Sequence, residues 1–229
     1  MKRPFIAVFA FLILPVLPGK AEEASLGGSI TLPALESKTK RTFRGSVYRS
    51  RLESSSKVSA KKKQAVSPFK DVVVSAHPLS FRVEVQPLPE PARVEQFDVA
   101  FTPHVLPITA GTTVHFVNKD KIYHNVFSLT RGVTFDIGRK PTGVVEPQKI
   151  DKVGEIELFC DIHPQMNATI LSLDTPYFTQ PDARGHYAVA DLPAGTYEIR
   201  VYHPDLPLFE EQIELQAGQQ LVKDFILNR

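Results

Sequence analysis

The chain has 229 residues, of which 19 are proline and 12 are glycine, and its formal net charge at pH 7 is +2. This length allows one large or two small domains with a buried core. A net charge so close to zero gives no indication of nucleic-acid binding, and no nucleic-acid partner is expected. Short runs rich in Val, Ile, Phe and Tyr alternate with Pro, Gly, Asn and Asp, without heptads or long amphipathic helices. The sequence therefore predicts an all-β protein.

Residues 1–21 have the pattern of a secretory signal peptide. Lys2 and Arg3 precede an uncharged run from Pro4 to Pro18, and small residues then offer a cleavage site. The run is shorter than the roughly 20 residues needed to span a bilayer. We therefore expect a periplasmic or otherwise secreted protein, with no stable membrane insertion after signal cleavage. The alternative is an uncleaved membrane anchor.

The next segment, residues 22–91, combines strand patterns with a basic stretch. "SLGGSITLP" and "RTFRGSVYRS" predict two short strands, and "KDVVVSAHPLSFRVEVQP" predicts a strand, a turn and a second strand. From Lys38 to Lys70 there are eleven Lys and Arg residues against one acidic residue, Glu53. We interpret this stretch as a solvated loop, the alternative being a docking patch for an acidic partner. The Pro-rich "LPEPAR" marks a boundary near residue 91.

Short strands at regular spacing follow this boundary, among them "TTVHFVN" and "EIELFC", and they predict a sandwich or a barrel. Side chains alternate along a strand, so Val114 and Phe116 should share one face of the first. For the same reason Ile156, Leu158 and Cys160 should share one face of the second. Cys160 should therefore point into the core at the end of its strand.

Cys160 is the only cysteine of the chain, so an exported protein could not use it for an internal disulfide. The pattern C-x₂-H-x₂-M places His163 and Met166 in the same loop. Thiolate, imidazole and thioether suit copper, and a second imidazole would complete a trigonal His₂Cys site with a weak axial Met. His124, which follows "TTVHFVN", is the best candidate for that position. The alternative is a set of ordinary core residues that bind no metal.

The stretch from about Val94 to Asp174 resembles a cupredoxin, the small blue-copper fold. C-x₂-H-x₂-M with Pro after the histidine is closest to amicyanin, and "AGTTVHFVNKD…HNV" resembles the family's Gly-Thr-Val-x-Phe-x-Asn strand and first ligand. The resemblance implies a Greek-key cupredoxin sandwich at residues 92–175. It also implies one type 1 copper ion held by His124, Cys160, His163 and Met166.

The same resemblance gives Asn125 a supporting role. Its backbone N–H is expected to point at the thiolate, and its side chain is expected to tie the two ligand loops together, which fixes the ligand geometry. One departure from the family pattern is Asp161, an acidic residue directly after the cysteine. Asp161 could alter this tie or the reduction potential.

Residues 176–229 resemble the carboxypeptidase regulatory-like β-sandwich, a smaller transthyretin/Ig-like fold. The resemblance is carried by Asp182-x-x-Gly185-x-Tyr187 and by Leu192-Pro193-Ala194-Gly195-Thr196-Tyr197. So short a segment forms too little sheet to be stable alone. We hypothesise that residues ~25–90 and ~175–229 form one discontinuous sandwich with the cupredoxin inserted. The alternative is a plain N-terminal extension of the cupredoxin. By resemblance, chains of this layout are often labelled methylamine utilisation proteins.

Together these features predict an exported type 1 copper protein that transfers single electrons between redox protein partners. It is not expected to be an enzyme, because the sequence lacks the His-x-His pairs that hold the extra coppers of multicopper oxidases. One alternative is a copper-binding or copper-delivery protein that uses the same residues, and another is a non-redox β-sandwich interaction module. His104 is interpreted as a surface residue rather than a supplementary ligand.

Overall fold

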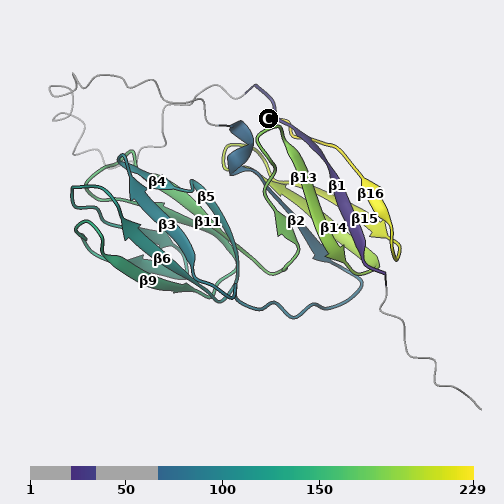
Figure 1. Ribbon diagram of the computed structural model, residues 1–229, viewed down its shortest axis with the longest axis horizontal. Coiled ribbons are helices and arrows are strands. Elements are labelled where there is room, and N and C mark those ends of the chain that lie inside the picture. The colour runs from purple at the N-terminus through teal and green to yellow at the C-terminus, as the bar shows by residue number, and fades with distance from the viewer. Residues whose placement is uncertain (1–21, 35–66) are drawn as a thin grey trace, which may run out of the picture.

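The computed structural model describes residues 22–34 and 67–229, which form an all-β protein, as the sequence predicts (Figure 1). The one helical element in these ranges is a 3₁₀ turn, η1 (Pro68–Asp71). The predicted signal peptide, the strand "RTFRGSVYRS" and nearly all of the basic stretch lie outside the described residues. Among the residues that the structure describes, no helix has the length and apolar character required to cross a lipid bilayer.

The first of two sandwiches is built from strands at both ends of the chain, and we call it the flanking sandwich. One of its sheets has the order β13-β1-β16, with β17 also paired to β1, and the other has the order β12-β2-β14-β15. The strands are β1 (Ala24–Thr31), β2 (Val73–Pro78), β12 (Phe178–Thr179), β13 (His186–Leu192), β14 (Gly195–Tyr202), β15 (Phe209–Leu215), β16 (Gln220–Val222) and β17 (Phe225–Ile226).

Strands from before and after residues 92–175 alternate within both sheets of the flanking sandwich. β1 runs antiparallel to β13 and parallel to β16 and β17, while β2 lies antiparallel between β12 and β14. Leu26 and Val74 from the N-terminal part share one core with Tyr187 and Ile199 from the C-terminal part. We propose that residues 22–91 and 176–229 form one discontinuous domain.

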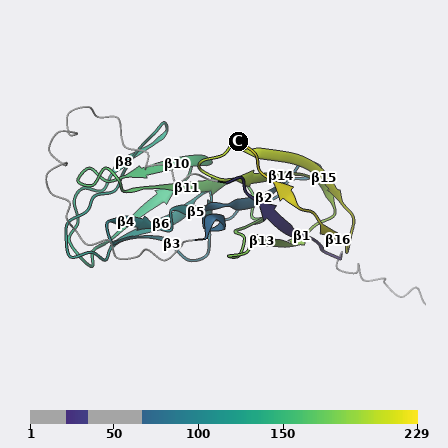
Figure 2. The ribbon, with the colours of Figure 1, turned by 90° about the horizontal axis from the view of Figure 1, so that it is seen from above.

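The second sandwich, formed by the strands between, carries the candidate site, and we call it the inserted sandwich. Its sheets have the orders β4-β3-β6-β9 and β5-β11-β10-β7-β8. The strands are β3 (Ala92–Phe97), β4 (Ala100–Thr102), β5 (Val105–Thr109), β6 (Thr112–Asn118), β7 (Phe127–Thr130), β8 (Val133–Asp136), β9 (Val145–Ile150), β10 (Gly154–Phe159) and β11 (Asn167–Leu173). The chain crosses repeatedly from one sheet to the other, as in a Greek-key sandwich. Figure 2 shows the two layers.

The core of the inserted sandwich follows the predicted alternation. Val114 and Phe116 are buried, as are Ile156 and Leu158, with at most 1 % of each exposed. Cys160, next on the same face, is also buried and belongs to the same apolar cluster. The alternation along β10 therefore places the thiol of Cys160 inside the sandwich, directly after the strand ends.

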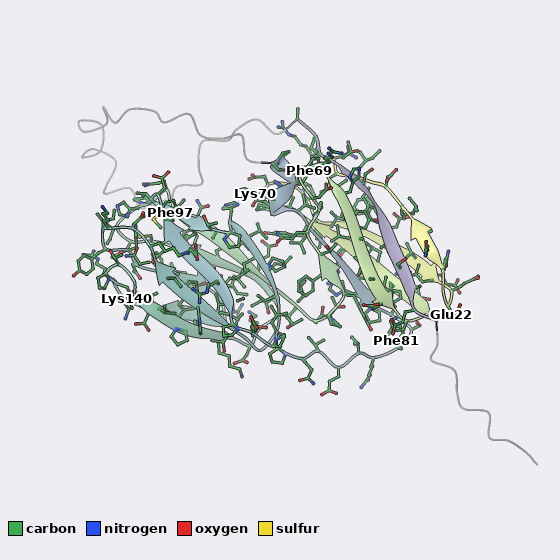
Figure 3. The ribbon with its side chains drawn as sticks, viewed as in Figure 1. Glu22, Phe69, Lys70, Phe81, Phe97 and Lys140 are labelled. Carbon is green, nitrogen blue, oxygen red and sulfur yellow. The ribbon has the colours of Figure 1, made fainter. Side chains whose placement is uncertain are left out.

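The two sandwiches touch through a small apolar cluster and through polar contacts. Val73 and Tyr202 of the flanking sandwich pack there with Val105, Leu171 and Leu173 of the inserted sandwich. The Tyr202 hydroxyl donates to Glu155 Oε2 at 3.0 Å, and η1, whose Phe69 and Lys70 are labelled in Figure 3, lies between the sandwiches. The chain passes between the sandwiches twice, through residues 79–91 and 174–177.

The ion pair between His104 and Asp71 should make stability depend on pH. His104 Nδ1 lies 3.0 Å from Asp71 Oδ2, and this hydrogen bond raises the pKa of His104 above 6.5 although burial opposes it. The contribution is thus complete below pH 6.5 and disappears as pH rises through the higher pKa of the folded state. We expect His104→Gln to lower the melting temperature more at pH 5.5 than at pH 9.

The matched control for this prediction is His115→Gln, a histidine on the outer face of β6 in the same sandwich. His115→Gln should change the melting temperature little. If His104→Gln lowered the melting temperature more at pH 9 than at pH 5.5, the predicted direction of the pH dependence would be wrong.

One strand expectation from the sequence is wrong, that for the second strand of "KDVVVSAHPLSFRVEVQP". Residues 81–86 form no strand, because their surroundings supply other partners: Gln86 O accepts from Thr109 Oγ1 at 2.7 Å, and the N–H of Leu88 donates to Thr112 Oγ1 at 2.9 Å. At the other end of the chain, β16 and β17 are separated by Lys223 and Asp224. There Asp224 Oδ1 accepts from both the N–H and the hydroxyl of Ser29, at 2.8 Å each, and replaces part of the ladder.

Candidate metal centre

Three potential metal donors converge at one end of the inserted sandwich. His163 Nδ1 lies 3.1 Å from His124 Nδ1 and 4.0 Å from Cys160 Sγ. The donor atoms of these three residues all lie within 4.8 Å of one another. The residues come from two loops, one after β6 and one between β10 and β11. The structure thus brings together a His-Cys-His group from positions 39 residues apart.

The loop that follows β10 folds back on itself. The backbone N–H of Met166 donates to the carbonyl of His163 at 2.9 Å, which closes a tight turn. Met166 is 1 % exposed and belongs to the same apolar cluster as Cys160. All four residues that the sequence predicts as ligands therefore lie in or directly beside this loop and the His124 loop.

The loop that carries His124 is held by an isolated bridge and by Asn118. The N–H of Lys140 donates to the carbonyl of His124 at 2.7 Å, and the reverse bond measures 3.2 Å. Asn118, the buried last residue of β6, donates from Nδ2 to the carbonyls of Ile122 and Lys140, each at 2.8 Å. Lys140 is labelled in Figure 3 at the end of the inserted sandwich remote from the flanking strands.

Burial separates His163 from the other candidate ligands. His124, Cys160 and Met166 are at most 4 % exposed, whereas His163 is only partly buried. Burial and the neighbouring His124 lower the pKa of His163, although the nearby Asp120 and Asp161 oppose them. Its imidazole is therefore neutral at pH 7, the form that binds metals.

Asp120 is a site residue that the sequence reasoning missed. Its Oδ2 lies 2.7 Å from His124 Nε2, on the side of the ring opposite the Nδ1 that faces His163. Burial acts to raise the pKa of Asp120, but hydrogen bonds from Val99 N–H, His124 and Asp98 N–H together lower it. The only signal in the sequence is an acid four residues before the histidine, which is common in loops.

Asp161 and Asn125, the two further residues singled out in the sequence, differ in their hydrogen bonds. Asp161 Oδ2 accepts from Nε and Nη2 of Arg139, at 3.1 and 2.9 Å, so its charge is balanced by an ion pair with the loop between β8 and β9. Asn125 is buried, its carbonyl accepts from Gln96 Nε2 at 3.0 Å, and its Oδ1 has no hydrogen-bond partner among the described residues. The supporting role expected for Asn125 stays a prediction.

The chemistry of the donor set fits a metal ion that binds imidazole and thiolate, as copper does. Zinc binds ring nitrogens at about 2.0–2.1 Å and thiolates at about 2.3 Å, so an ion of similar bond lengths could contact atoms separated by the observed 3.1 and 4.0 Å. A trigonal His₂Cys set with a nearby Met is the arrangement of blue-copper sites. His104, in contrast, pairs with Asp71 and Asn167 and lies outside the group.

Comparison with solved structures identifies cupredoxins as neighbours of this chain. A copper-containing nitrite reductase from Thermus scotoductus is 26% identical over 43% of this chain and 26% of its own, with a TM-score of 0.36. A purple cupredoxin from Nitrosopumilus maritimus is 24% identical over 36% of this chain and 99% of its own, with a TM-score of 0.33. An oxidised amicyanin variant is 18% identical over 36% of this chain and 82% of its own, with a TM-score of 0.34.

No family model matches the chain, and no curated protein matches it either. The structural neighbours cover less than half of this chain, and the aligned part spans about a quarter of the nitrite reductase. The function is therefore inferred from the residues of the site. The resemblance of the flanking sandwich to the carboxypeptidase regulatory-like module stays a prediction.

Proposed function

We propose that this protein is an exported carrier that holds one type 1 copper ion and transfers single electrons between redox protein partners. The proposed ligands are His124, Cys160, His163 and Met166. The observation that carries the proposal is the convergence of two imidazole nitrogens on a buried thiol, with donor atoms within 4.8 Å of one another. Copper bound there would supply a one-electron Cu(II)/Cu(I) couple.

The residues support electron transfer in three ways. Cys160 and His124 are fixed by the end of β10 and by the Lys140 bridge, so the donors need little rearrangement between oxidation states. The buried apolar surroundings of Cys160 and Met166 exclude water. His163 is the one proposed ligand that reaches the surface, and its neighbour Ile162 is 36% exposed.

The exposed edge of His163 is the proposed route for electrons. Ile122 and Tyr123, which precede His124, are 46% and 59% exposed, so the other ligand loop also presents apolar surface. Apolar side chains exposed around a partly buried ligand suit transient contact with another protein. We propose a carrier rather than an enzyme because four protein ligands around one ion leave little room for a substrate.

The test is titration of the purified, metal-free chain with Cu(II), followed by its visible spectrum. We expect one equivalent to produce an intense thiolate-to-copper band that bleaches on reduction and returns on oxidation. Binding without that band, or binding of Cu(I) alone, would favour copper delivery over electron transfer. Absence of copper binding would contradict both and leave an interaction module.

A further inference from the structure

A two-residue turn far from Asp120 in sequence points both of its amide groups at that carboxylate. Asp98 N–H donates to Asp120 Oδ1 at 2.8 Å, and Val99 N–H donates to Oδ2 at 3.0 Å. The turn joins β3 to β4, whose residues Phe97 and Ala100 pair across it. Asp120 is thereby bound to the turn of the β3–β4 hairpin, which lies beside the end of β6.

The conformation of this turn is unusual for its sequence. Asp98 and Val99 have φ values of 52° and 55°, the left-handed region at both central positions, as in a type I′ hairpin turn. Asn-Gly is the usual pair in that turn, and a β-branched residue such as Val99 is disfavoured there. Strained backbone of this kind persists where the surroundings determine it, and functional sites are common places for it.

The backbone of Asp120 is fixed as well. Its N–H donates to Asn118 Oδ1 at 2.9 Å, and its carbonyl accepts from the hydroxyl of Thr142. The side chain is 14% exposed. Every polar group of Asp120 therefore has a partner, and the carboxylate has one orientation toward His124.

A carboxylate only accepts hydrogen bonds, so the 2.7 Å contact requires the proton of a neutral His124 ring to sit on Nε2. Nδ1 then carries the lone pair and faces His163. In the metal-free chain the hydrogen bond across the 3.1 Å contact is consequently donated by His163 Nδ1. His124 is ready to bind a metal, and His163 is the ligand that adjusts.

We propose that Asp120, held by the amide groups of the Asp98–Val99 turn, positions His124 as a ligand by fixing the proton on Nε2 and presenting Nδ1 to the metal site. The inference rests on the proposed copper function. A carboxylate behind a ligating imidazole also increases its basicity, which stabilises Cu(II) more than Cu(I). Asp120 is thus a positioning residue that also lowers the reduction potential.

The test compares Asp120→Asn with Asp182→Asn in the full chain. Asp182 is a matched control, because its carboxylate also accepts from two backbone amides, Arg184 N–H and His186 N–H, and lies 3.3 Å from a histidine nitrogen, but in the flanking sandwich. The first readout is imidazole ¹⁵N NMR of the metal-free protein. We expect His124 protonated on Nε2 in the wild type and in Asp182→Asn, and a mixture of tautomers in Asp120→Asn.

The second readout uses the copper-loaded protein. Loss of such a partner typically weakens metal binding about 10–100-fold. A tenfold loss for Cu(II) with Cu(I) unchanged raises the potential by about 59 mV, and Asp182→Asn should leave the potential unchanged.

Wild-type His124 protonated on Nδ1 would overturn the proposal without any variant having to fold. Equal potentials in the wild type and Asp120→Asn would also overturn it. If His124 carried its proton on Nε2 but the protein bound no copper, the proposed copper function would be wrong and the Asp120–His124 hydrogen bond would still be supported. Failure of the copper function can therefore be distinguished from failure of the Asp120 assignment.

Discussion

Cys160→Ser should abolish the intense visible band of the copper-loaded protein completely. The band requires charge transfer from a thiolate sulfur, and Cys160 is the only cysteine in the chain. Its donor atom lies with those of His124 and His163, so no other sulfur can replace it in a thiolate bond. The measurement is the visible spectrum after addition of one equivalent of Cu(II).

Two further variants make this result specific. Cys160→Ala should lose the band equally, which separates the loss of the thiol from the effect of a buried hydroxyl. His104→Gln should keep the band, because His104 pairs with Asp71 and Asn167 rather than with the donor group. A folded Cys160→Ser protein that retained the band would defeat the ligand assignment.

Gly28→Ala should destabilise the protein by about 3 kcal/mol, at the upper end of the usual cost of overpacking. A Cβ at Gly28 would lie 1.9 Å from the carbonyl oxygen of Lys223, and backbone atoms cannot move aside as a side chain can. The contact lies where β1 runs beside β16 and β17. For a chain of this size, such a loss of stability should lower the melting temperature by roughly 6–12 °C.

The neighbouring Gly27→Ala is the control for this prediction. Its Cβ would lie 3.3 Å from the carbonyl oxygen of Tyr187, which requires a movement of only a few tenths of an ångström. We expect a much smaller change in the melting temperature for Gly27→Ala than for Gly28→Ala. The measurement is thermal unfolding monitored by far-UV circular dichroism. Equal stability of both variants and the wild type would show that β1 does not lie between β13 and β16.

The parts of the fold that depend on local alternation could be predicted from the sequence. Burial of Val114, Phe116 and Leu158 follows from period-two patterns, and so does the inward direction of Cys160. Residues 81–86 fit the same pattern but form no strand. Their partners are side chains of Thr109 and Thr112, which no pattern within the segment reveals.

The site could be predicted in its ligand types but not in the residues that support them. His124, Cys160 and His163 stand out because their side chains are chemically distinctive and suitably spaced. Asp120 does not stand out, because its contacts join the loop after β6 to the β3–β4 turn. These hydrogen bonds arise because the ends of β3 and β6 lie side by side in one sheet, although they are distant in sequence, and a single sequence does not display that pairing.

The parallel pairing of β1 with β16 and β17 has a mechanical consequence. Glu22 and Arg229 both belong to the flanking sandwich, at the start of β1 and just beyond the end of β17. A pull applied between these two residues would load the parallel strands in shear, so that their hydrogen bonds resist together rather than opening one after another. The inserted sandwich lies outside this line of force. The candidate metal centre would thus keep its geometry under tension that strains the flanking sandwich.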